Sequence, residues 1–177
     1  MQINQIPFTE TGYLNSLMVD YVSENKNLKS FYKRFPNVAS AEAQMQEKRK
    51  SAIARPVLVE ALKKQYKSLS HFSHQESVAE NIEKLASDST FTVTTGHQLC
   101  LFTGPLYFIY KIANAINMAK KLKEKYQQNQ FVPVFWMASE DHDFEEINHI
   151  HFKGHKITWH REMGGAVGQM EVESCAK

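Results

Sequence analysis

The feature that most constrains the fold is an apolar run at residues 131–138, which comes soon after a long amphipathic segment. A near-continuous apolar run is typical of a strand that is buried on both faces of a parallel sheet. Residues 91–95 alternate as a shorter strand does, and the segment between the two strands predicts a helix over residues 105–125. Parallel strands joined by a helix form a right-handed crossover, so the sequence predicts an α/β fold with a parallel sheet.

The predicted helix has an apolar side that we expect to face the sheet. This side is made of Leu106, Ile109, Ala113, Ile116 and Leu122. Four lysines lie near the C-terminal end of the same segment, where positive charge suits the helix dipole.

Polar residues follow both predicted strands at the point where each strand ends. Gly96, His97 and Gln98 come after the first strand, and Glu140, Asp141 and His142 come after the second. In an open α/β sheet, ligands bind beyond the carboxyl ends of the strands, so we expect the two groups to face one site. A lone histidine is often an ordinary loop residue, and it is the position of His97 that favours a function.

The acidic group after the second strand has two interpretations. Its carboxylates and imidazole suit general acid and base catalysis, or Mg²⁺ binding through carboxylate and phosphate oxygens. Asp143 and its neighbours also suit the N-cap and first turn of a short helix that begins at Phe144. The residues alone leave both interpretations open.

The turn formed by Thr103, Gly104 and Pro105 opens the long predicted helix. The free backbone N–H groups of a helix start suit a phosphate or a carboxylate. An ordinary N-cap by Thr103, with Gly104 allowing close packing, explains the same residues equally well. Neither Walker nor full GxGxxG spacing is present to decide between them.

Four histidines follow the acidic group, namely His149, His151, His155 and His160. Their segment alternates around Lys153 and Gly154 as a β-hairpin does. Because hairpin alternation explains these imidazoles, and because structural zinc sites usually recruit cysteine, we expect no metal to be bound there.

The residues before the predicted sheet have helical patterns. We expect helices over residues 13–21, 28–35, 56–66 and 75–86, and the last of them is ended by Ser87, Asp88 and Ser89. That break predicts a domain boundary, with an N-terminal helical segment at residues 1–87. Residues 88–177 would then form the first part of the core, with a β-hairpin insertion.

Charge and cysteine content narrow the class of partner. Lysine and arginine number 21 against 19 acidic residues, so net charge favours neither nucleic acid nor membrane. Cys100 and Cys175 have no metal-type spacing, which fits a reducing compartment, and we expect a cytoplasmic protein. The sequence stops soon after Gly164, Gly165 and Gly168 without a closing helix or strand, so we expect it to be truncated.

Three motifs in order resemble one family. They are TTGHQLCLFTGPLYFIYKIANAI, VPVFWMASEDHDFEEIN and GGAVGQM. Together they are similar to the N-terminal part of the bacillithiol biosynthesis cysteine-adding enzymes, the cysteine ligases called BshC. The resemblance implies a Rossmann-like core of the nucleotidylyl-transferase type, with a coiled coil further along the chain and a homodimer formed through that later region.

The resemblance also implies a reaction, in which the carboxyl group of cysteine joins the amine of glucosaminyl malate. Because amide formation from a free carboxylate is uphill in water, the carboxyl must be activated as an acyl-adenylate or acyl-phosphate, and ATP with Mg²⁺ is the expected source. Gly96, His97, Gln98, Thr103, Gly104 and Pro105 would bind substrate or nucleotide, and Glu140, Asp141 and His142 would be catalytic. Two other classes stay open: a nucleotide- or metal-dependent transferase or hydrolase, and a non-catalytic helical interaction module.

Overall fold

The computed structural model describes residues 4–69, 75–162 and 164–172. The chain divides into two compact units, Met1–Ala52 and Ile53–Lys177. The division does not fall at residues 87 and 88, where the sequence predicted it. The reason is that helices α4 (Arg55–Lys67) and α5 (Gln75–Lys84) pack against the sheet of the second unit. Cys175 lies outside the described residues.

The first unit consists of short helices: α1 (Phe8–Thr11), α2 (Ser16–Val22), the 3-10 helix η1 (Lys26–Leu28) and α3 (Ala41–Lys48). Asn15 caps α2 by accepting the backbone N–H of Met18 at 2.9 Å. The helix predicted over residues 28–35 is wrong, since the chain runs through turns there. Pro36 disfavours a helical conformation at Phe35, and Tyr32 and Phe35 each pack against Tyr21 with ring centroids 5.3 Å apart.

An ion-pair cluster ties α3 to the turns before it. Arg34 Nη1 donates to Glu47 Oε2 at 2.6 Å, and Lys33 Nζ lies 2.8 Å from Glu47 Oε1. Hydrogen bonds from Lys33 and then Arg34 lower the pKa of Glu47 from 4.5 to about 2. The Glu47 carboxylate is therefore favoured in the folded state.

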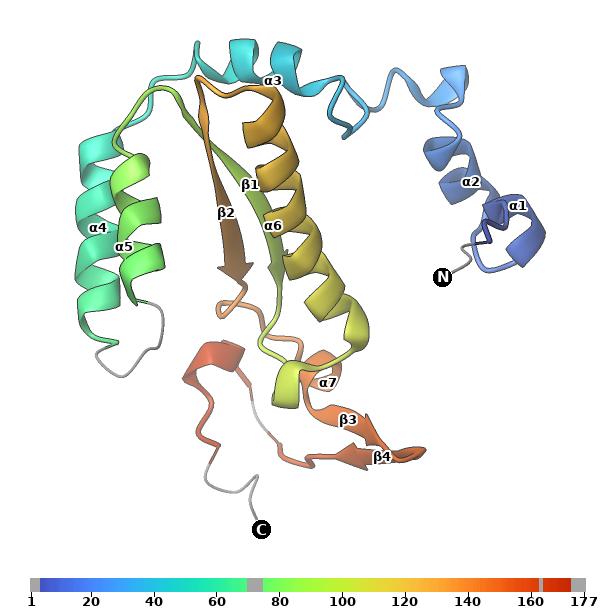
Figure 1. The fold of residues 1–177 in the computed structure, drawn as a ribbon. Helices are drawn as coiled ribbons and strands as arrows, with labels where there is room; N and C mark the ends of the chain where they lie inside the picture. Colours follow the sequence, from blue (N-terminus) through green and yellow to red (C-terminus); the bar gives the residue numbers. More distant parts are fainter. Residues whose placement is uncertain (1–3, 70–74, 163, 173–177) are drawn as a thin grey trace. The chain divides into compact units, whose positions relative to one another are not determined.

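The second unit is built on a parallel pair of strands, β1 (Thr90–His97) and β2 (Gln130–Met137). Thr90 lies opposite Gln130 at one end of the pair and His97 lies opposite Met137 at the other. Helix α6 (Leu106–Lys125) connects the two strands (Figure 1). The predicted parallel crossover is confirmed.

Helices cover both faces of this strand pair, with α6 on one face and α4 and α5 on the other (Figure 1). On the first face, Phe108 of α6 meets Phe135 of β2 edge to face, with ring centroids 5.2 Å apart. On the second face, Val132 of β2 joins a buried cluster with Val59, Ile82 and Leu85. Successive β2 side chains thus alternate between two apolar layers, as a strand buried on both faces requires.

The side of α6 that faces the sheet matches the predicted one at Leu122, which is buried, and differs from it at three other positions. Leu106, Ile109 and Ile116 are exposed to 64 %, 49 % and 38 %. The buried positions are Ala115, Ala119 and Leu122, which lie on the same side as Phe108. Since the helix carries two apolar stripes, periodicity alone could not tell which of them meets the sheet.

Arg55 holds the helical layer to the start of β1. Its guanidinium donates to the carbonyl oxygens of Leu85 at 2.8 Å and Thr90 at 3.1 Å, and it pairs with Asp88 at 3.1 Å. The Arg55 side chain is only 13 % exposed. The predicted break at Ser87 is therefore a tight connection inside the second unit.

Short elements follow β2. They are α7 (Phe144–Ile147), the antiparallel strands β3 (His149–Phe152) and β4 (His155–Thr158), and the 3-10 helix η3 (Val167–Gln169). Lys153 and Gly154 form the turn between β3 and β4 with φ of 48° and 81°. Two consecutive positive φ angles match a type I′ hairpin turn, and the predicted hairpin is confirmed.

Val132→Ala tests the layer between β2 and the helices α4 and α5. Val132 is only 3 % exposed, so the truncation leaves a cavity and should lower the free energy of unfolding by about 2 kcal/mol. Val57→Ala is the matched control, because Val57 lies on α4 but is 66 % exposed, and its effect should stay within about 0.5 kcal/mol. Urea unfolding curves measure both. Equal losses of stability in the two variants would contradict the packing of Val132 against α4 and α5.

Glu47 gives a pH-dependent prediction. Because its pKa is lowered from 4.5 to about 2, its contribution to stability is full above pH 4.5 and is lost as the pH falls toward 2. A carbon-13 NMR titration of the Glu47 carboxyl should show this low midpoint, and Lys33→Met should raise it. Lys48→Met removes an equal charge outside the ion-pair cluster and should leave the midpoint in place. A titration midpoint near pH 4.5 for Glu47 in the wild-type protein would show that the ion-pair cluster does not form.

Candidate functional site

The carboxyl ends of β1 and β2 come close together because Gly96 has no side chain. A Cβ at Gly96 would lie 3.0 Å from the Trp136 carbonyl oxygen and 3.3 Å from the Trp136 Cβ. The strand also runs on through His97, two residues beyond its predicted end. Gly96 and His97 therefore belong to the strand, and the loop begins at Gln98.

His97 is buried and faces α6. Its Nδ1 lies 3.2 Å from the Gln98 carbonyl oxygen, and its Nε2 is hydrogen-bonded to the hydroxyl of Tyr107. The His97 ring also contacts the rings of Tyr107 and Phe108, with centroids 5.0 and 5.7 Å away. Both imidazole nitrogens thus have partners, and only 7 % of the residue is exposed.

Gln98 connects the end of β1 to the residues after β2. Its side-chain amide nitrogen donates to Asp141 Oδ2 at 3.0 Å and also to Glu146 Oε2 on α7. One neutral donor therefore serves two carboxylates. This contact places Gln98, Asp141 and Glu146 in one site at the end of the strand pair.

The acidic residues after β2 divide into different roles. Asp143 caps α7, since its Oδ1 accepts the backbone N–H of Glu146 at 3.2 Å. Asp141 faces Gln98, and its Oδ1 accepts the backbone N–H of Asp143 at 3.0 Å. Glu140 is exposed, and the side chain of His142 is 90 % exposed, with its Nδ1 3.8 Å from Asp141. Of the three residues predicted to be catalytic, only Asp141 faces the other strand end.

Local contacts shift three pKa values at this site. The backbone N–H of Asp143 is the main cause that lowers the pKa of Asp141, and Gln98 adds to it. Desolvation raises the pKa of Tyr107 and of Cys100, and the negative charge of Glu146 raises both further. At neutral pH the site therefore combines the Asp141 carboxylate with a neutral phenol and a neutral thiol.

The connection from β1 to α6 has an unusual backbone. The 3-10 helix η2 (Leu101–Thr103) contains positive φ at Phe102 and Thr103, and Gly104 follows with φ of 58°. A Cβ at Gly104 would lie 2.5 Å from the Cβ of Cys100, so only glycine fits there. The N-cap of α6 is Pro105, without a side-chain cap, which excludes the predicted alternative of an N-cap by Thr103.

Lys111, on the second turn of α6, brings a positive charge to the same end of the sheet. Its ammonium donates to the carbonyl oxygen of Gly96. The ammonium also lies 5.9 Å from the centroid of the Tyr107 ring. The site thus has a cation near β1 and carboxylates beyond β2.

The GGAVGQM motif folds back onto the loop after β2. The backbone N–H of Val167 donates to the Asp141 carbonyl oxygen at 2.7 Å, and that of Gly168 donates to the Ser139 carbonyl oxygen at 2.8 Å. A Cβ at Gly168 would lie 2.6 Å from the Cβ of Ser139. The motif therefore supports the loop that carries Asp141.

The histidines of the hairpin do not reach the hydrogen-bonded group formed by Gln98, Asp141 and Glu146. His149 contacts Asn148 through Nδ1 at 3.1 Å, and the His149 and His151 rings meet edge to face at 5.7 Å. Across the described ranges, no three histidine, cysteine or acidic side chains stand together as a set of metal ligands.

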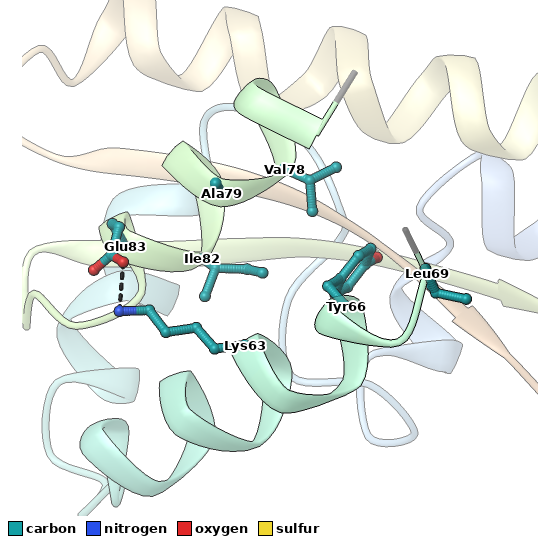
Figure 2. A pocket seen from close by; sticks show the side chains of 7 residues that line it. All are labelled: Lys63, Tyr66, Leu69, Val78, Ala79, Ile82 and Glu83. Atoms are coloured by element: carbon teal, nitrogen blue, oxygen red, sulfur yellow. Dashed lines mark ion pairs between the residues drawn. The ribbon is translucent and has the colours of Figure 1, made fainter. Parts of the chain in front are cut away.

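A cavity of about 200 Å³ lies elsewhere in the second unit, between α4 and α5 (Figure 2). Tyr66, Leu69, Val78 and Ile82 line it, and an ion pair between Lys63 and Glu83 borders it. None of these lining residues belongs to the strand ends. The cavity offers apolar contacts and is separate from the hydrogen-bonded group around Gln98.

Sequence reasoning missed three residues of the site. Tyr107 and Lys111 were counted as parts of the helix, and Glu146 as part of a short helical turn. The i, i+4 spacing of Tyr107 and Lys111 on one helix face was the available signal, because it places both side chains at the helix start beside the strand end. Glu146 lacked such a signal, since only the path of the chain after β2 brings it to Gln98.

The parallel pair, its crossover helix and the polar groups at the carboxyl ends define a Rossmann-like α/β domain. The family model "Bacillithiol biosynthesis BshC, N-terminal Rossmann-like domain" matches residues 1–177. The chain belongs to this family.

Curated relatives agree with this assignment. The chain is 47 % identical over 177 residues to a protein of Flavobacterium psychrophilum, and 49 % identical over 179 residues to one of Christiangramia forsetii. Both relatives are named "Putative cysteine ligase BshC". Each alignment covers 98 % of this chain and 33 % of the relative, so the chain spans about a third of their length. In the part of the chain that the structure describes, no helix is both long and apolar enough to cross a bilayer.

Gly168→Ala tests the support of the Asp141 loop. The new Cβ would overlap Ser139, so we expect a loss of about 1–3 kcal/mol in the free energy of unfolding, as in other overpacked sites. Gly164→Ala is the matched control, because a Cβ there meets no atom within 4 Å. Urea unfolding of both variants measures the difference. A Gly168→Ala protein as stable as Gly164→Ala would show that the motif does not pack there.

Proposed function

We propose that this chain is part of a ligase that joins the carboxyl group of cysteine to the amine of glucosaminyl malate. The observation that carries the proposal is the pair of carboxylates, Asp141 and Glu146, that share the amide nitrogen of Gln98. Membership in the BshC family supports the choice of substrates. The relatives' printed name, cysteine ligase, supports the choice of reaction.

The two carboxylates suit an ammonium group. Each accepts a hydrogen bond from the same neutral amide, so an ammonium that replaces this amide would gain charge-assisted hydrogen bonds to both. We assign this position to the amine of glucosaminyl malate. One of the carboxylates then takes the proton that this amine loses before it attacks the cysteine carboxyl.

Positive groups on the other side of the site suit phosphate. Lys111 and the uncapped first turn of α6 would hold the phosphates of ATP, accompanied by Mg²⁺. When bound, ATP would supply the activation that the cysteine carboxyl needs. In this arrangement the helix start after Thr103, Gly104 and Pro105 serves the nucleotide, and the carboxylates beyond β2 serve the amine.

The setting of the reaction is part of the proposal. Both substrates are small molecules, and we propose a cytoplasmic enzyme, since the spacing of its two cysteines fits a reducing compartment. Homodimer formation through a region outside these 177 residues stays a prediction.

The proposal is tested with the complete gene product, cysteine, glucosaminyl malate and ATP, with the amide followed by mass spectrometry. Asp141→Asn and Glu146→Gln should each lower kcat/KM for glucosaminyl malate at least tenfold, because each removes a charged hydrogen-bond partner. Glu145→Gln is the matched control: Glu145 neighbours Glu146 on α7 and is exposed, and its loss should change kcat/KM less than twofold. Circular dichroism checks that each variant is folded.

Two outcomes would contradict the proposal. A wild-type protein that forms no amide from these substrates would refute the ligase. Equal activity of Glu146→Gln and Glu145→Gln would refute the assignment of the amine to the carboxylate pair.

A further inference from the structure

We infer that Tyr107 is a substrate-binding residue that accepts a hydrogen bond from the amine of glucosaminyl malate, and that buried His97 is the positioning residue that aims its hydroxyl. This inference rests on the proposed function and extends it. It adds a third acceptor to the two carboxylates and makes the site selective for a primary amine.

The direction of the hydrogen bond between Tyr107 and His97 follows from the other nitrogen of the imidazole. Nδ1 of His97 lies 3.2 Å from the Gln98 carbonyl oxygen, which only accepts, and 3.5 Å from the Cys100 sulfur, so a hydrogen on Nδ1 serves the closer and stronger partner. Nε2 of a neutral imidazole is then an acceptor, and the Tyr107 hydroxyl donates to it. The lone pairs of the Tyr107 oxygen are left to accept a hydrogen bond from a ligand.

Burial makes His97 a rigid support for this hydroxyl. His97 ends β1, is 7 % exposed, and packs its ring against the rings of Tyr107 and Phe108. Tyr107, in contrast, is 49 % exposed. The pair therefore has a fixed inner member and an accessible outer member, which is the arrangement that a preorganised ligand contact needs.

A continuous chain of contacts joins Tyr107 to the carboxylates. Tyr107 bonds to His97, His97 to the Gln98 backbone, and the Gln98 side chain to Asp141 and Glu146. Desolvation, and then the negative charge of Glu146, raise the pKa of Tyr107, so the phenol stays protonated at neutral pH.

A primary ammonium group has three N–H donors. In the proposed complex Asp141, Glu146 and Tyr107 supply three acceptors, from the loop after β2, helix α7 and helix α6. In the free protein the two carboxylates are bonded to Gln98 and the phenol to His97. Loss of one proton to a carboxylate leaves two N–H groups held and frees the nitrogen lone pair for attack. An N-methylated amine lacks one donor and should bind more weakly.

The test measures binding of glucosaminyl malate and of cysteine to the complete gene product by calorimetry. Tyr107→Phe should weaken binding of glucosaminyl malate about ten- to hundredfold, the usual effect of losing a hydrogen bond to a charged group, and change cysteine binding less than twofold. Tyr110→Phe is the matched control, because it removes the same hydroxyl from a neighbouring, 66 % exposed position on α6. It should leave both affinities unchanged.

Variants of His97 test the positioning role. His97→Gln keeps an acceptor for the Tyr107 hydroxyl and should stay within about threefold of wild type, whereas His97→Leu should behave like Tyr107→Phe. If His97→Leu fails to fold, the comparison of His97→Gln with Tyr107→Phe still tests whether His97 positions the Tyr107 hydroxyl. The double variant His97→Gln, Tyr107→Phe should bind no more weakly than Tyr107→Phe alone, because the two residues act as one unit.

The outcomes separate this inference from the ligase itself. If Tyr107→Phe binds glucosaminyl malate as tightly as wild type does, or loses equal affinity for both substrates, the inference is overturned. The proposed ligase function still stands in that case, provided that the wild type forms the amide. A wild type that binds glucosaminyl malate through Tyr107 but forms no amide overturns the ligase and supports the amine site. A wild type that does not bind glucosaminyl malate overturns both.

Discussion

The parallel pairing of β1 with β2 is the constraint on which the site depends. Because His97 lies opposite Met137, both strands end at the same level and their loops begin side by side. Gln98 can then reach Asp141, 43 residues further along the chain. An antiparallel pair would put these loops at opposite ends of the sheet. Packing on both faces, by Phe108 on one and the Val132 cluster on the other, keeps the pair together.

The orientation of Asp141 is fixed by its own loop and by the chain that returns to it. Its carboxylate accepts from the Asp143 backbone and from Gln98, and its carbonyl oxygen accepts from Val167. Glu140 and His142 are the residues on either side and point to solvent. Consecutive side chains in a tight loop cannot share one direction, so the support given to Asp141 also determines that its neighbours are exposed.

Much of the fold of the second unit could be predicted, because it rests on local signals. The crossover, the helix through Tyr66, the short helix at Phe144 and the hairpin around Gly154 are all present. The sheet-facing side of α6 could not be predicted, since two apolar stripes compete and only the sheet selects one. The predicted domain boundary at residue 87 ignored Arg55, whose three contacts depend on tertiary structure.

The location of the site could be predicted from the sequence, but only some of its residues could. The carboxyl ends of the parallel strands predicted the location, and Gln98 and Asp141 lie there together. Which of several neighbouring acidic residues faces inward depends on φ and ψ in the loop, which residue types do not encode. Tyr107 was hidden for another reason: a tyrosine at a helix start looks like part of an amphipathic pattern until its partner, buried His97, is seen.

The charge balance around Gln98 explains why the site favours a cationic ligand. Gln98 satisfies hydrogen bonds of both carboxylates, yet its amide is neutral and leaves their negative charge in place. Two charges 4 Å apart near a protein surface interact with about 4 kcal/mol before the cost of desolvation, so an ammonium gains from each carboxylate what an amide cannot. In the free protein Gln98 therefore holds Asp141 and Glu146 at a common donor position without neutralising them, and an ammonium can take the place of its amide. A lysine there would neutralise the pair and remove the attraction that an incoming amine needs.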